Sequence, residues 1–572
     1  MAITTSKRNI IYAPRIEKGK GSGHLMRALR LARGSKNKVR IYIPNDSAKA
    51  QASKYCESGD EKYFIGDLTE LSLDSVIVCD LFKTSKEELS SFPANIPLLG
   101  IDEGGLFRNE IPFLIDTLPN LNKEKANIDN PGFNNPGRIA KTKLNNRNGV
   151  LVTFGGEDPA ELTLKTLTAL KEHNGHKISV LPPKNHKIPG PVERVKIMDR
   201  LADLPAKLGE FECVITSFGL TAMEAAFQGI PCLTVNPSVY HCKLASLGGF
   251  PTSRRPGIDE KLLNSFLQNP GDFVNNKYAS HTPAKLSDFL FGAEISGYPS
   301  CPVCGERGTS LARNSIRAYL KCPQCGLIYL FSMGESKENY SKNYFFEEYK
   351  KQYGKTYLED FDLIKERGYE RLKCITGLSH SANKKSLDIG CAFGPFLKAS
   401  AEAGFKPTGC DIAEEALEFI KSELGFPTRN AKNESVFRGG EMFSLITMWY
   451  VIEHLEDLTN ILKDVSRSLE PNGVFAFSTP NASGISGRKN LKKFLLGGPK
   501  DHYTVWSPKS ARKTLANFGL KVKKIVVTGH HPERFRLPGC RKGPLRGIYL
   551  LISKIFGLGD TFEAYAVKME GN

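Results

Sequence analysis

Short apolar runs alternate with amphipathic stretches along the first 290 residues of the chain. The runs at 9–12 and 39–43 have the length of buried parallel strands, and we expect a helix at 24–33 between them. The same alternation starts again with the run at 149–153. Such a pattern is typical of doubly wound α/β domains, which bind ligands at the carboxyl ends of their strands.

Composition changes along the chain divide it into segments. One stretch is rich in Asn, Pro, Gly and Lys, as linkers are, and a later one is a compact cysteine module. The predicted organisation is a Rossmann domain at 1–120, a linker at 121–148, a second Rossmann domain at 149–290, a cysteine module at 298–330, a helical connector at 331–384 and a third α/β domain at 385–572.

The composition narrows the classes of function. Apolar residues make up 40% and charged residues 24% of the 572 residues, an ordinary globular balance. The formal net charge of +18 favours anionic partners. Because there is no arginine-rich tract and no aromatic RNA-binding motif, we expect anionic small substrates and no nucleic acid. A basic solvated surface would give the same charge.

No segment is expected to cross a membrane. The apolar run after Lys7 and Arg8 is too short for a signal peptide, and the apolar stretch at 547–558 is short and interrupted by Ser553 and Lys554. We therefore expect a cytoplasmic protein without an integral membrane segment. In that reducing compartment the 13 cysteines favour metal binding over disulfides.

Two CxxC pairs form the cysteine module, with seventeen residues between the pairs. A glycine follows each pair and permits a tight turn. Four thiolates in this spacing suit tetrahedral Zn²⁺, and the filled ligand set predicts a structural zinc site. The expected ligands are Cys301, Cys304, Cys322 and Cys325.

A strand–turn–helix pattern at 386–396 indicates a nucleoside ligand. Asp388 lies near the end of the strand, and Gly390 and Gly394 let the backbone approach a ligand closely. About twenty residues further on, Asp411 ends a second strand, where a carboxylate can accept both hydroxyls of a ribose. The loop lacks the GxGxxG pattern of dinucleotide-binding proteins.

These features resemble the class I S-adenosylmethionine-dependent methyltransferases. The resemblance covers about residues 385–570 and rests on LDIGCAFGPFL, CDIAEEAL, MWYVIEHL and LEPNGVFAFSTPN. It implies S-adenosylmethionine as the cofactor. Asp388, Gly390 and Gly394 would line the methionine end of this cofactor, and Asp411 would hold its ribose. Ala392 replaces the usual second glycine, and Ser444 replaces an aspartate that often begins the fourth strand, which leaves the adenine contact open.

Two histidines are candidates for the base in methyl transfer. His454 follows Glu453 after the fourth predicted strand, and His502 follows Asp501 after the fifth. The cysteine module also resembles that of sugar C-methyltransferases of antibiotic pathways, which implicates a histidine at the position of His502. A structural role is the alternative for both. The sequence leaves open whether oxygen, nitrogen or carbon is methylated.

A glycine-rich turn, KGKGSGHLMR, follows the first strand and opens a helix. Its glycines make room for a ligand, and the helix N-terminus favours an anion. The histidine at the helix start is expected to point into the cleft, with helix capping as the alternative. The residues of this turn expected at the substrate are Gly21, Gly23, His24 and Arg27.

The second domain carries two further turns, TFGGED at 153–158 and TSFGLT at 216–221. With the helix that follows, they resemble the GT-B glycosyltransferases, in which such a turn holds a diphosphate and a glutamate holds the ribose. The substrate-binding residues that this resemblance implies are Gly155, Gly156, Gly219, Thr221 and Glu224.

The N-terminal motifs together resemble the UDP-sugar hydrolases of the pseudaminic acid pathway, over about residues 8–275. This resemblance implies that His24 is the base that activates water, and Asp102 fits an acidic position of the same domain. Phe218 and Leu220 depart from the family's Gly-Gly-Ser-Thr turn and would crowd a phosphate.

The expected fold class is therefore α/β, with a GT-B-like pair of Rossmann domains, a zinc ribbon and a class I Rossmann-like methyltransferase domain. We expect a bifunctional enzyme of sugar or nonulosonic acid biosynthesis that hydrolyses a UDP-amino sugar and methylates a sugar. The alternatives are a glycosyltransferase in place of the hydrolase, or an N-terminal module that binds a UDP-sugar without turnover.

Overall fold

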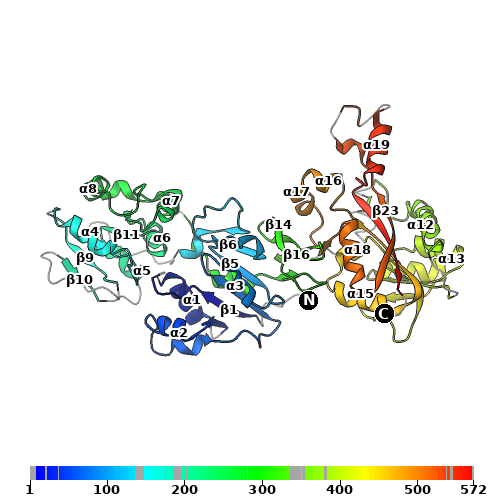
Figure 1. Ribbon diagram of the computed structural model, residues 1–572, viewed down its shortest axis with the longest axis horizontal. Helices are drawn as coiled ribbons and strands as arrows, with labels where there is room; N and C mark the ends of the chain where they lie inside the picture. The colour runs from blue at the N-terminus through cyan, green and yellow to red at the C-terminus, as the bar shows by residue number, and fades with distance from the viewer. Residues whose placement is uncertain are drawn as a thin grey trace. The chain divides into compact units, whose positions relative to one another are not determined.

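The computed structural model describes residues 8–19, 22–35, 38–135, 147–173, 175–183, 195–199, 204–279, 281–334, 349–350, 354–378, 383–535, 538–540 and 545–569. The chain forms two compact units, Ile3–Ala293 and Glu294–Asn572, whose elements are labelled in Figure 1. The apolar runs predicted as buried strands are confirmed as strands.

A seven-stranded parallel sheet forms the first part of the N-terminal unit, in the order β3-β2-β1-β4-β5-β6-β7. The strand order reverses between β1 and β4, which is where doubly wound sheets bind ligands. The bounds are β1 Asn9–Pro14, β2 Val39–Tyr42, β3 Phe64–Ile65, β4 Ser75–Asp80, β5 Leu98–Ile101, β6 Phe113–Asp116, β7 Ile128–Asp129, α1 Gly23–Gly34, α2 Asp46–Ser53 and α3 Lys86–Ser91.

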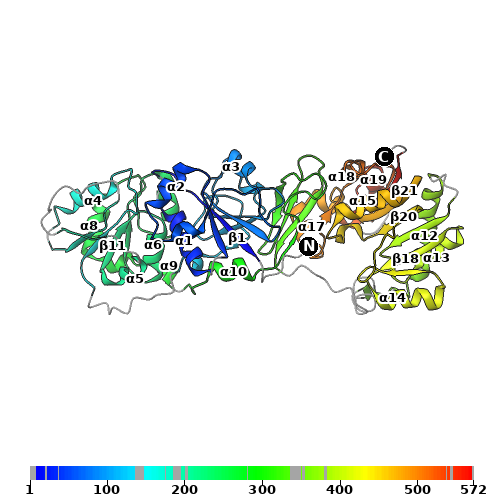
Figure 2. The same cartoon turned by 90° about the horizontal axis from the view of Figure 1, so that it is seen from below.

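A second parallel sheet follows in the order β10-β9-β8-β11-β12 and buries apolar side chains on both faces. Figure 2 shows α6 of this part beside α1. The bounds are β8 Val150–Val152, β9 Ile178–Val180, β10 Val195–Ile197, β11 Cys213–Thr216, β12 Cys232–Thr234, α4 Leu162–Leu170, α5 Leu204–Lys207, α6 Leu220–Phe227, α7 Val239–Leu247, α8 Glu260–Gln268, α9 Asn276–Ala279 and α10 Leu286–Gly292.

Two elements of this unit depart from the expected segments. β7 lies in the expected linker at 121–148 but pairs with β6 and extends the first sheet. α10 lies in the expected second domain but packs on the first, where Phe289 stacks on Phe113 with ring centroids 6.0 Å apart. The chain therefore returns to its first sheet after completing the second.

The C-terminal unit begins with a small antiparallel sheet in the order β13-β16-β15-β14, and β22 pairs with the first two residues of β16. This sheet carries the cysteine module. The bounds are β13 Ile295–Gly297, β14 Thr309–Arg313, β15 Arg317–Lys321, β16 Ile328–Met333 and β22 Thr504–Val505.

The larger sheet of this unit has the order β19-β18-β17-β20-β21-β24-β23, parallel except for β24, and it confirms the Rossmann-like fold expected for residues 385–572. None of the helices in the described ranges has the length and apolar character needed to cross a bilayer. The bounds are β17 Lys385–Ile389, β18 Lys406–Asp411, β19 Thr428–Asn430, β20 Phe443–Trp449, β21 Leu469–Pro480, β23 Leu520–Thr528, β24 Thr561–Lys568, α12 Phe361–Thr376, α13 Pro395–Glu402, α14 Glu414–Phe419, α15 Leu458–Ser468, α16 Ile485–Lys489, α17 Leu491–Leu496, α18 Pro508–Ala516 and α19 Leu545–Ile555.

Candidate functional sites

The turn between β17 and α13 is built from left-handed backbone positions. Gly390 and Gly394 have φ angles of +74° and +79°, and Ala392 between them has +46°. The N–H of Ala392 donates a hydrogen bond of 2.8 Å to Oδ2 of Asp411 at the end of β18. The glycine turn and the aspartate of the second strand, which the sequence predicted separately, are therefore in direct contact.

The Asp411 carboxylate is buried and fixed by backbone donors. Its Oδ1 also accepts hydrogen bonds from the N–H groups of Ile412 at 2.7 Å and Ala413 at 3.0 Å. Burial raises the pKa of Asp411. Because a carboxylate offers about four acceptor positions, one position is left over, so the orientation is preset for one further donor such as a ribose hydroxyl.

A cluster of aromatic rings lies beside this turn. The ring centroid of Tyr357 is 6.1 Å from that of Phe393, which lies 5.4 Å from that of Phe419. Tyr357 belongs to the expected connector, and the sequence analysis did not single it out. The Tyr, Lys and Glu richness of that segment was the only signal available, since aromatic faces suit a nucleobase but carry no fixed motif.

Replacing Gly390 with alanine should destabilise the protein by at least about 2 kcal/mol. An added Cβ would lie 2.2 Å from Cγ2 of Val451, and a left-handed backbone costs a non-glycine residue about 1–2 kcal/mol by itself. Gly404→Ala is the matched control, because Gly404 has φ +84° but open space around its Cβ position. Urea denaturation of both variants measures the difference, and equal losses would show that the Val451 contact is unimportant.

Asp388 is buried at the end of β17 and accepts a hydrogen bond of 2.6 Å from Oγ1 of Thr447 on β20. Burial raises the pKa of Asp388 to about 7, while Thr447 opposes the shift. An unfolded aspartate titrates near ~3.9. Between these two values the folded protein holds a proton that the unfolded chain has released, so rising pH favours unfolding.

We therefore expect the free energy of unfolding to fall by up to about 1.4 kcal/mol per pH unit between pH 4 and 7 through Asp388 alone. Asp388→Asn keeps the acceptor for Thr447 but cannot ionise, so its stability should depend less on pH. Urea denaturation of wild type and variant across this range isolates the contribution. Parallel pH profiles for the two proteins would contradict it.

The two candidate histidines of the methyltransferase prediction lie together, with ring centroids 4.7 Å apart. Nδ1 of His454 lies 3.0 Å from Oδ2 of the buried Asp501. Burial, followed by the nearby His454, lowers the pKa of His502 to about 3, so this ring stays neutral near pH 7. The chain thus places one histidine held by a carboxylate beside a second that is neutral and a weak base.

The same residues could also hold a metal ion. Glu453, His454 and His502 each offer one donor atom, and these atoms lie within 4.8 Å of one another. Two imidazoles and a carboxylate are ligands suited to several divalent transition metals. Within the described ranges, the other group of this kind is the set of four cysteines.

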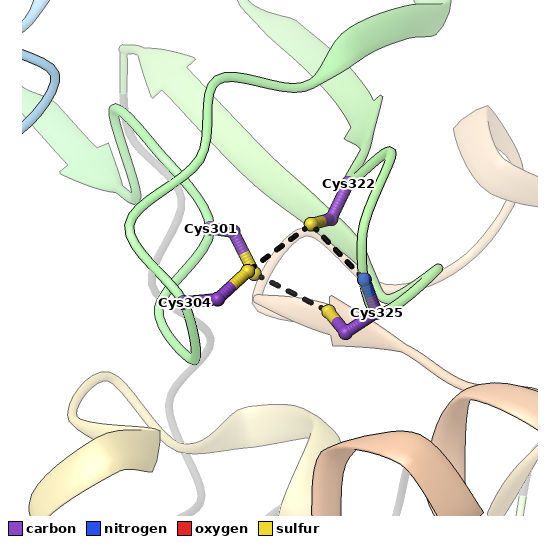
Figure 3. Close-up of side chains that lie close together, drawn as sticks. All are labelled: Cys301, Cys304, Cys322 and Cys325. Carbon is purple, nitrogen blue, oxygen red and sulfur yellow. Dashed lines mark hydrogen bonds between the residues drawn. The ribbon is translucent and has the colours of Figure 1, made fainter. Parts of the chain in front are cut away.

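The four cysteines converge from two turns, as Figure 3 shows. Sγ of Cys301 lies 3.5 Å from Sγ of Cys325, and Sγ of Cys304 lies 3.3 Å from Sγ of Cys322. These separations far exceed a disulfide bond of about 2.05 Å and approach the ~3.8 Å between sulfurs around tetrahedral zinc. The four cysteines predicted as ligands are therefore brought together, as free thiols.

The cysteine module is attached to both loops that carry the histidines. β16 pairs with β22, which begins two residues after His502, and the N–H of Leu330 donates to the carbonyl of Tyr503 at 2.9 Å. On the other loop, the hydroxyl of Tyr298 donates to the carbonyl of Leu455 at 2.7 Å, next to His454. The position of both histidines therefore depends on this module.

A cleft of about 1360 Å³ lies within the N-terminal unit, between its two sheets. The cleft is lined by the turns that carry Gly155 and Gly219 and by the starts of α1 and α6. All the predicted substrate-binding residues of this unit border it except Gly21, which lies outside the described residues. They are Gly23, His24, Arg27, Gly155, Gly156, Gly219, Thr221 and Glu224.

His24 is held by an aspartate that the sequence analysis missed. Its Nδ1 lies 2.6 Å from Oδ1 of Asp80, the last residue of β4, and Oδ2 of Asp80 accepts a hydrogen bond of 2.8 Å from the hydroxyl of Tyr12. Burial would raise the pKa of Asp80, but Arg27 and His24 lower it to about 2. The carboxylate is therefore ionised and leaves Nε2 of His24 for the cleft.

Arg27 joins this group from the next turn of α1. Its guanidinium lies 3.3 Å from Asp80 and 2.9 Å from Asp102, which has φ +50° at the end of β5. Three donors hold the Asp102 carboxylate: the N–H and hydroxyl of Thr117 and the N–H of Leu118. Arg27 thus pairs with two aspartates and also borders the cleft, so its predicted contact with the substrate stays a prediction.

Close contacts between the two halves of the cleft explain other residues of the motifs. A Cβ at Gly156 would lie 2.6 Å from the Tyr55 ring, so glycine is required there by a protein contact. Leu220 packs next to Gly23, and Phe218 packs in the core against Phe250. Both side chains also border the cleft, so the crowding expected at this turn stays a prediction.

Glu224 on α6, the predicted ribose ligand, pairs with Arg30 on α1. The distance between Nη1 of Arg30 and Oε1 of Glu224 is 2.8 Å, and the carboxylate is almost fully buried. A nucleotide that uses this carboxylate must therefore share it with Arg30 or replace that contact.

Comparison with known proteins places a family match in the C-terminal unit. Residues 365–525 match the model of a family described as "Methyltransferase domain". The ubiquinone biosynthesis O-methyltransferase of Thiobacillus denitrificans is 25% identical over 175 residues, which cover 28% of this chain and 75% of that protein. The enzyme of the same name from Methylobacterium sp. is 28% identical over 166 residues, covering 27% and 67%.

Solved methyltransferase structures are also similar over part of the chain. A SAM-dependent methyltransferase from Archaeoglobus fulgidus is 17% identical with a TM-score of 0.29, covering 38% of this chain and 98% of its own. Geranyl diphosphate C-methyltransferase from Streptomyces coelicolor is 13% identical with a TM-score of 0.26, covering 35% and 76%.

Proposed function

We propose, from the premise that residues 365–525 form an S-adenosylmethionine-dependent methyltransferase domain, that this chain is a bifunctional enzyme of sugar or nonulosonic acid biosynthesis. The C-terminal unit would methylate a sugar, and the N-terminal unit would hydrolyse a UDP-amino sugar. One observation carries the proposal. In each unit the Nδ1 atom of a histidine lies within hydrogen-bond distance of a buried aspartate, His24 with Asp80 and His454 with Asp501.

In the C-terminal unit the cofactor supplies an electrophilic methyl group when it is bound. The turn of Gly390, Ala392 and Gly394 would hold its methionine end through backbone groups, Asp388 would lie near that end, and Asp411 would accept from its ribose. The rings of Tyr357 and Phe393 supply apolar surface for its adenine.

The acceptor in this proposal is a sugar hydroxyl. His454, oriented by the Asp501 carboxylate, would take the proton of the hydroxyl, so that the oxygen becomes nucleophilic and the proton ends on the His454 imidazole. Asp501 would stabilise the resulting imidazolium, and the half-buried, neutral ring of His502 beside it would position the acceptor. The O-methyltransferase names of the similar proteins support oxygen as the acceptor atom.

The four cysteines fit a structural zinc ion. Their sulfurs are close enough for one tetrahedral ion, all four positions are protein ligands, and the turns that present them have glycines with positive φ, Gly305 at +74° and Gly326 at +78°. We assign the ion no chemical step, only the folding of the module that holds the histidine loops.

In the N-terminal unit His24 acts as the general base. Its Nε2 takes a proton from water as the water oxygen attacks the anomeric carbon, the bond from that carbon to the diphosphate oxygen breaks, and UDP leaves. Asp80 stabilises the imidazolium that forms, and Arg27 keeps Asp80 ionised. The starts of α1 and α6 border the cleft and offer N–H groups to the diphosphate.

Incubation of the full chain with candidate UDP-amino sugars and S-adenosylmethionine, followed by mass spectrometry, tests this function. We expect free UDP without any added acceptor and a sugar product heavier by one methyl group. UDP release that strictly requires an acceptor would identify the N-terminal unit as a glycosyltransferase. Methylation of no sugar among substrates and products would refute the pathway assignment.

A further inference from the structure

α19 in the C-terminal unit exposes its apolar side instead of burying it. Its apolar side chains lie in solvent, while a polar one is buried: Ser553 has no exposed surface and its hydroxyl bonds to Nδ1 of His530 at 2.7 Å. The exposed apolar side chains, which we call the α19 face, are Leu545, Ile548, Leu551, Ile555 and Phe556.

The helix is nevertheless anchored to the domain. The ring of Tyr549 packs on that of Phe535 with centroids 5.3 Å apart, and the 3-10 helix Pro532–Phe535 (η10) lies between α19 and α16. A guanidinium nitrogen of Arg534 in η10 donates to Oγ of Ser486 on α16 at 2.9 Å. Contacts on the opposite side of the helix therefore fix α19 in an orientation that leaves the α19 face exposed.

Basic residues lie on α19 and on the segment that η10 links to it. α19 itself carries exposed Arg546 and Lys554 and no acidic residue. α16, which η10 links to α19, and the residues that follow it to Lys500 add further exposed cations with no acidic residue between 485 and 500, whereas η10 itself carries Glu533, which pairs with His531. These cations are Arg488, Lys489, Lys492, Lys493 and Lys500.

We propose that the α19 face docks on an anionic phospholipid surface. An interfacial helix needs apolar side chains that enter the boundary between headgroups and acyl chains, and flanking cations that meet lipid phosphates. α19 supplies the first and its flanks with α16–α17 supply the second. A protein partner would have to be both apolar and acidic at this patch. Every anionic bilayer has both properties, because an apolar acyl region lies beneath a negatively charged headgroup layer. This docking does not depend on the proposed sugar chemistry.

Co-sedimentation of the full-length protein with vesicles tests the proposal. We expect binding to phosphatidylcholine vesicles that contain phosphatidylglycerol, weaker binding to phosphatidylcholine alone, and weakening with salt. The double variant Ile548→Glu, Leu551→Glu should lower the partition coefficient at least about tenfold. Leu106→Glu is the matched control, because Leu106 is the most exposed leucine among the described residues of the N-terminal unit and lies in a different unit from α19.

Thermal unfolding establishes that the double variant folds, as expected for two exposed positions. Wild-type protein that stays unbound with anionic vesicles, or a double variant that binds them as wild type does, would overturn the proposal. So would a lipid-free dimer in sedimentation velocity that the double variant converts to monomer, because the α19 face would then be an interface between copies of this chain.

Discussion

Replacing His24 with alanine is expected to lower the rate of UDP release from a UDP-amino sugar by about a hundred- to ten-thousand-fold, the usual contribution of a general base. The reason lies in the pair of His24 with the ionised Asp80, which leaves one ring nitrogen for the cleft. Steady-state assays of UDP formation measure the effect. His173→Ala, which changes a histidine outside the cleft, is the control and should retain the wild-type rate.

A second variant separates catalysis from folding. Asp80→Asn keeps the size of the side chain but removes the charge that stabilises an imidazolium, so it should lower the rate as well while leaving UDP binding in place. Unchanged turnover in both variants would contradict the role assigned to His24. Wild-type protein that binds a UDP-sugar without releasing UDP would instead support the alternative that the sequence left open, a unit that binds without hydrolysing.

Replacing Cys322 with serine should lower the rate of methyl transfer by about a hundredfold or more while leaving cofactor affinity within about threefold. The module that these cysteines close holds β22 and hence His502, whereas the cofactor turn between β17 and α13 belongs to the larger sheet. Methylation rates and binding of S-adenosylhomocysteine, measured on the same preparations, give the two values. A chelator that strips zinc should act in the same direction.

Cys374→Ser is the matched control, because Cys374 lies on α12 away from the cluster. Metal analysis of purified wild-type protein should find about one zinc ion per chain. Absence of zinc from wild type, or full methylation by Cys322→Ser, would contradict the role assigned to the cysteine module.

The elements that local patterns define could be predicted from the sequence. Buried strands such as β1 and β8 contain short apolar runs, and the turn with Gly390 and the CxxC pairs have fixed spacings, so each carries its own signal. The contact between Ala392 and Asp411 follows from the fold that those signals imply.

Partners that are distant in sequence could not be predicted. Asp80 lies 56 residues from His24, and Asp501 lies 47 residues from His454, and no local pattern links either pair. The ion pairs of Arg27 with Asp80 and Asp102 could not be predicted for the same reason. The apolar stretch that contains α19 was visible in the sequence, but only the bond between Ser553 and His530 shows which side faces solvent.

Calorimetric titration of the zinc-loaded full-length protein with S-adenosylhomocysteine tests the central claim most directly. We predict saturable heat for one site per chain with a dissociation constant of about 1–100 μM, and its loss when Asp411 is replaced with alanine. No heat from folded, zinc-loaded wild-type protein would contradict the assignment of the glycine turn and Asp411 to a methyl-donor site.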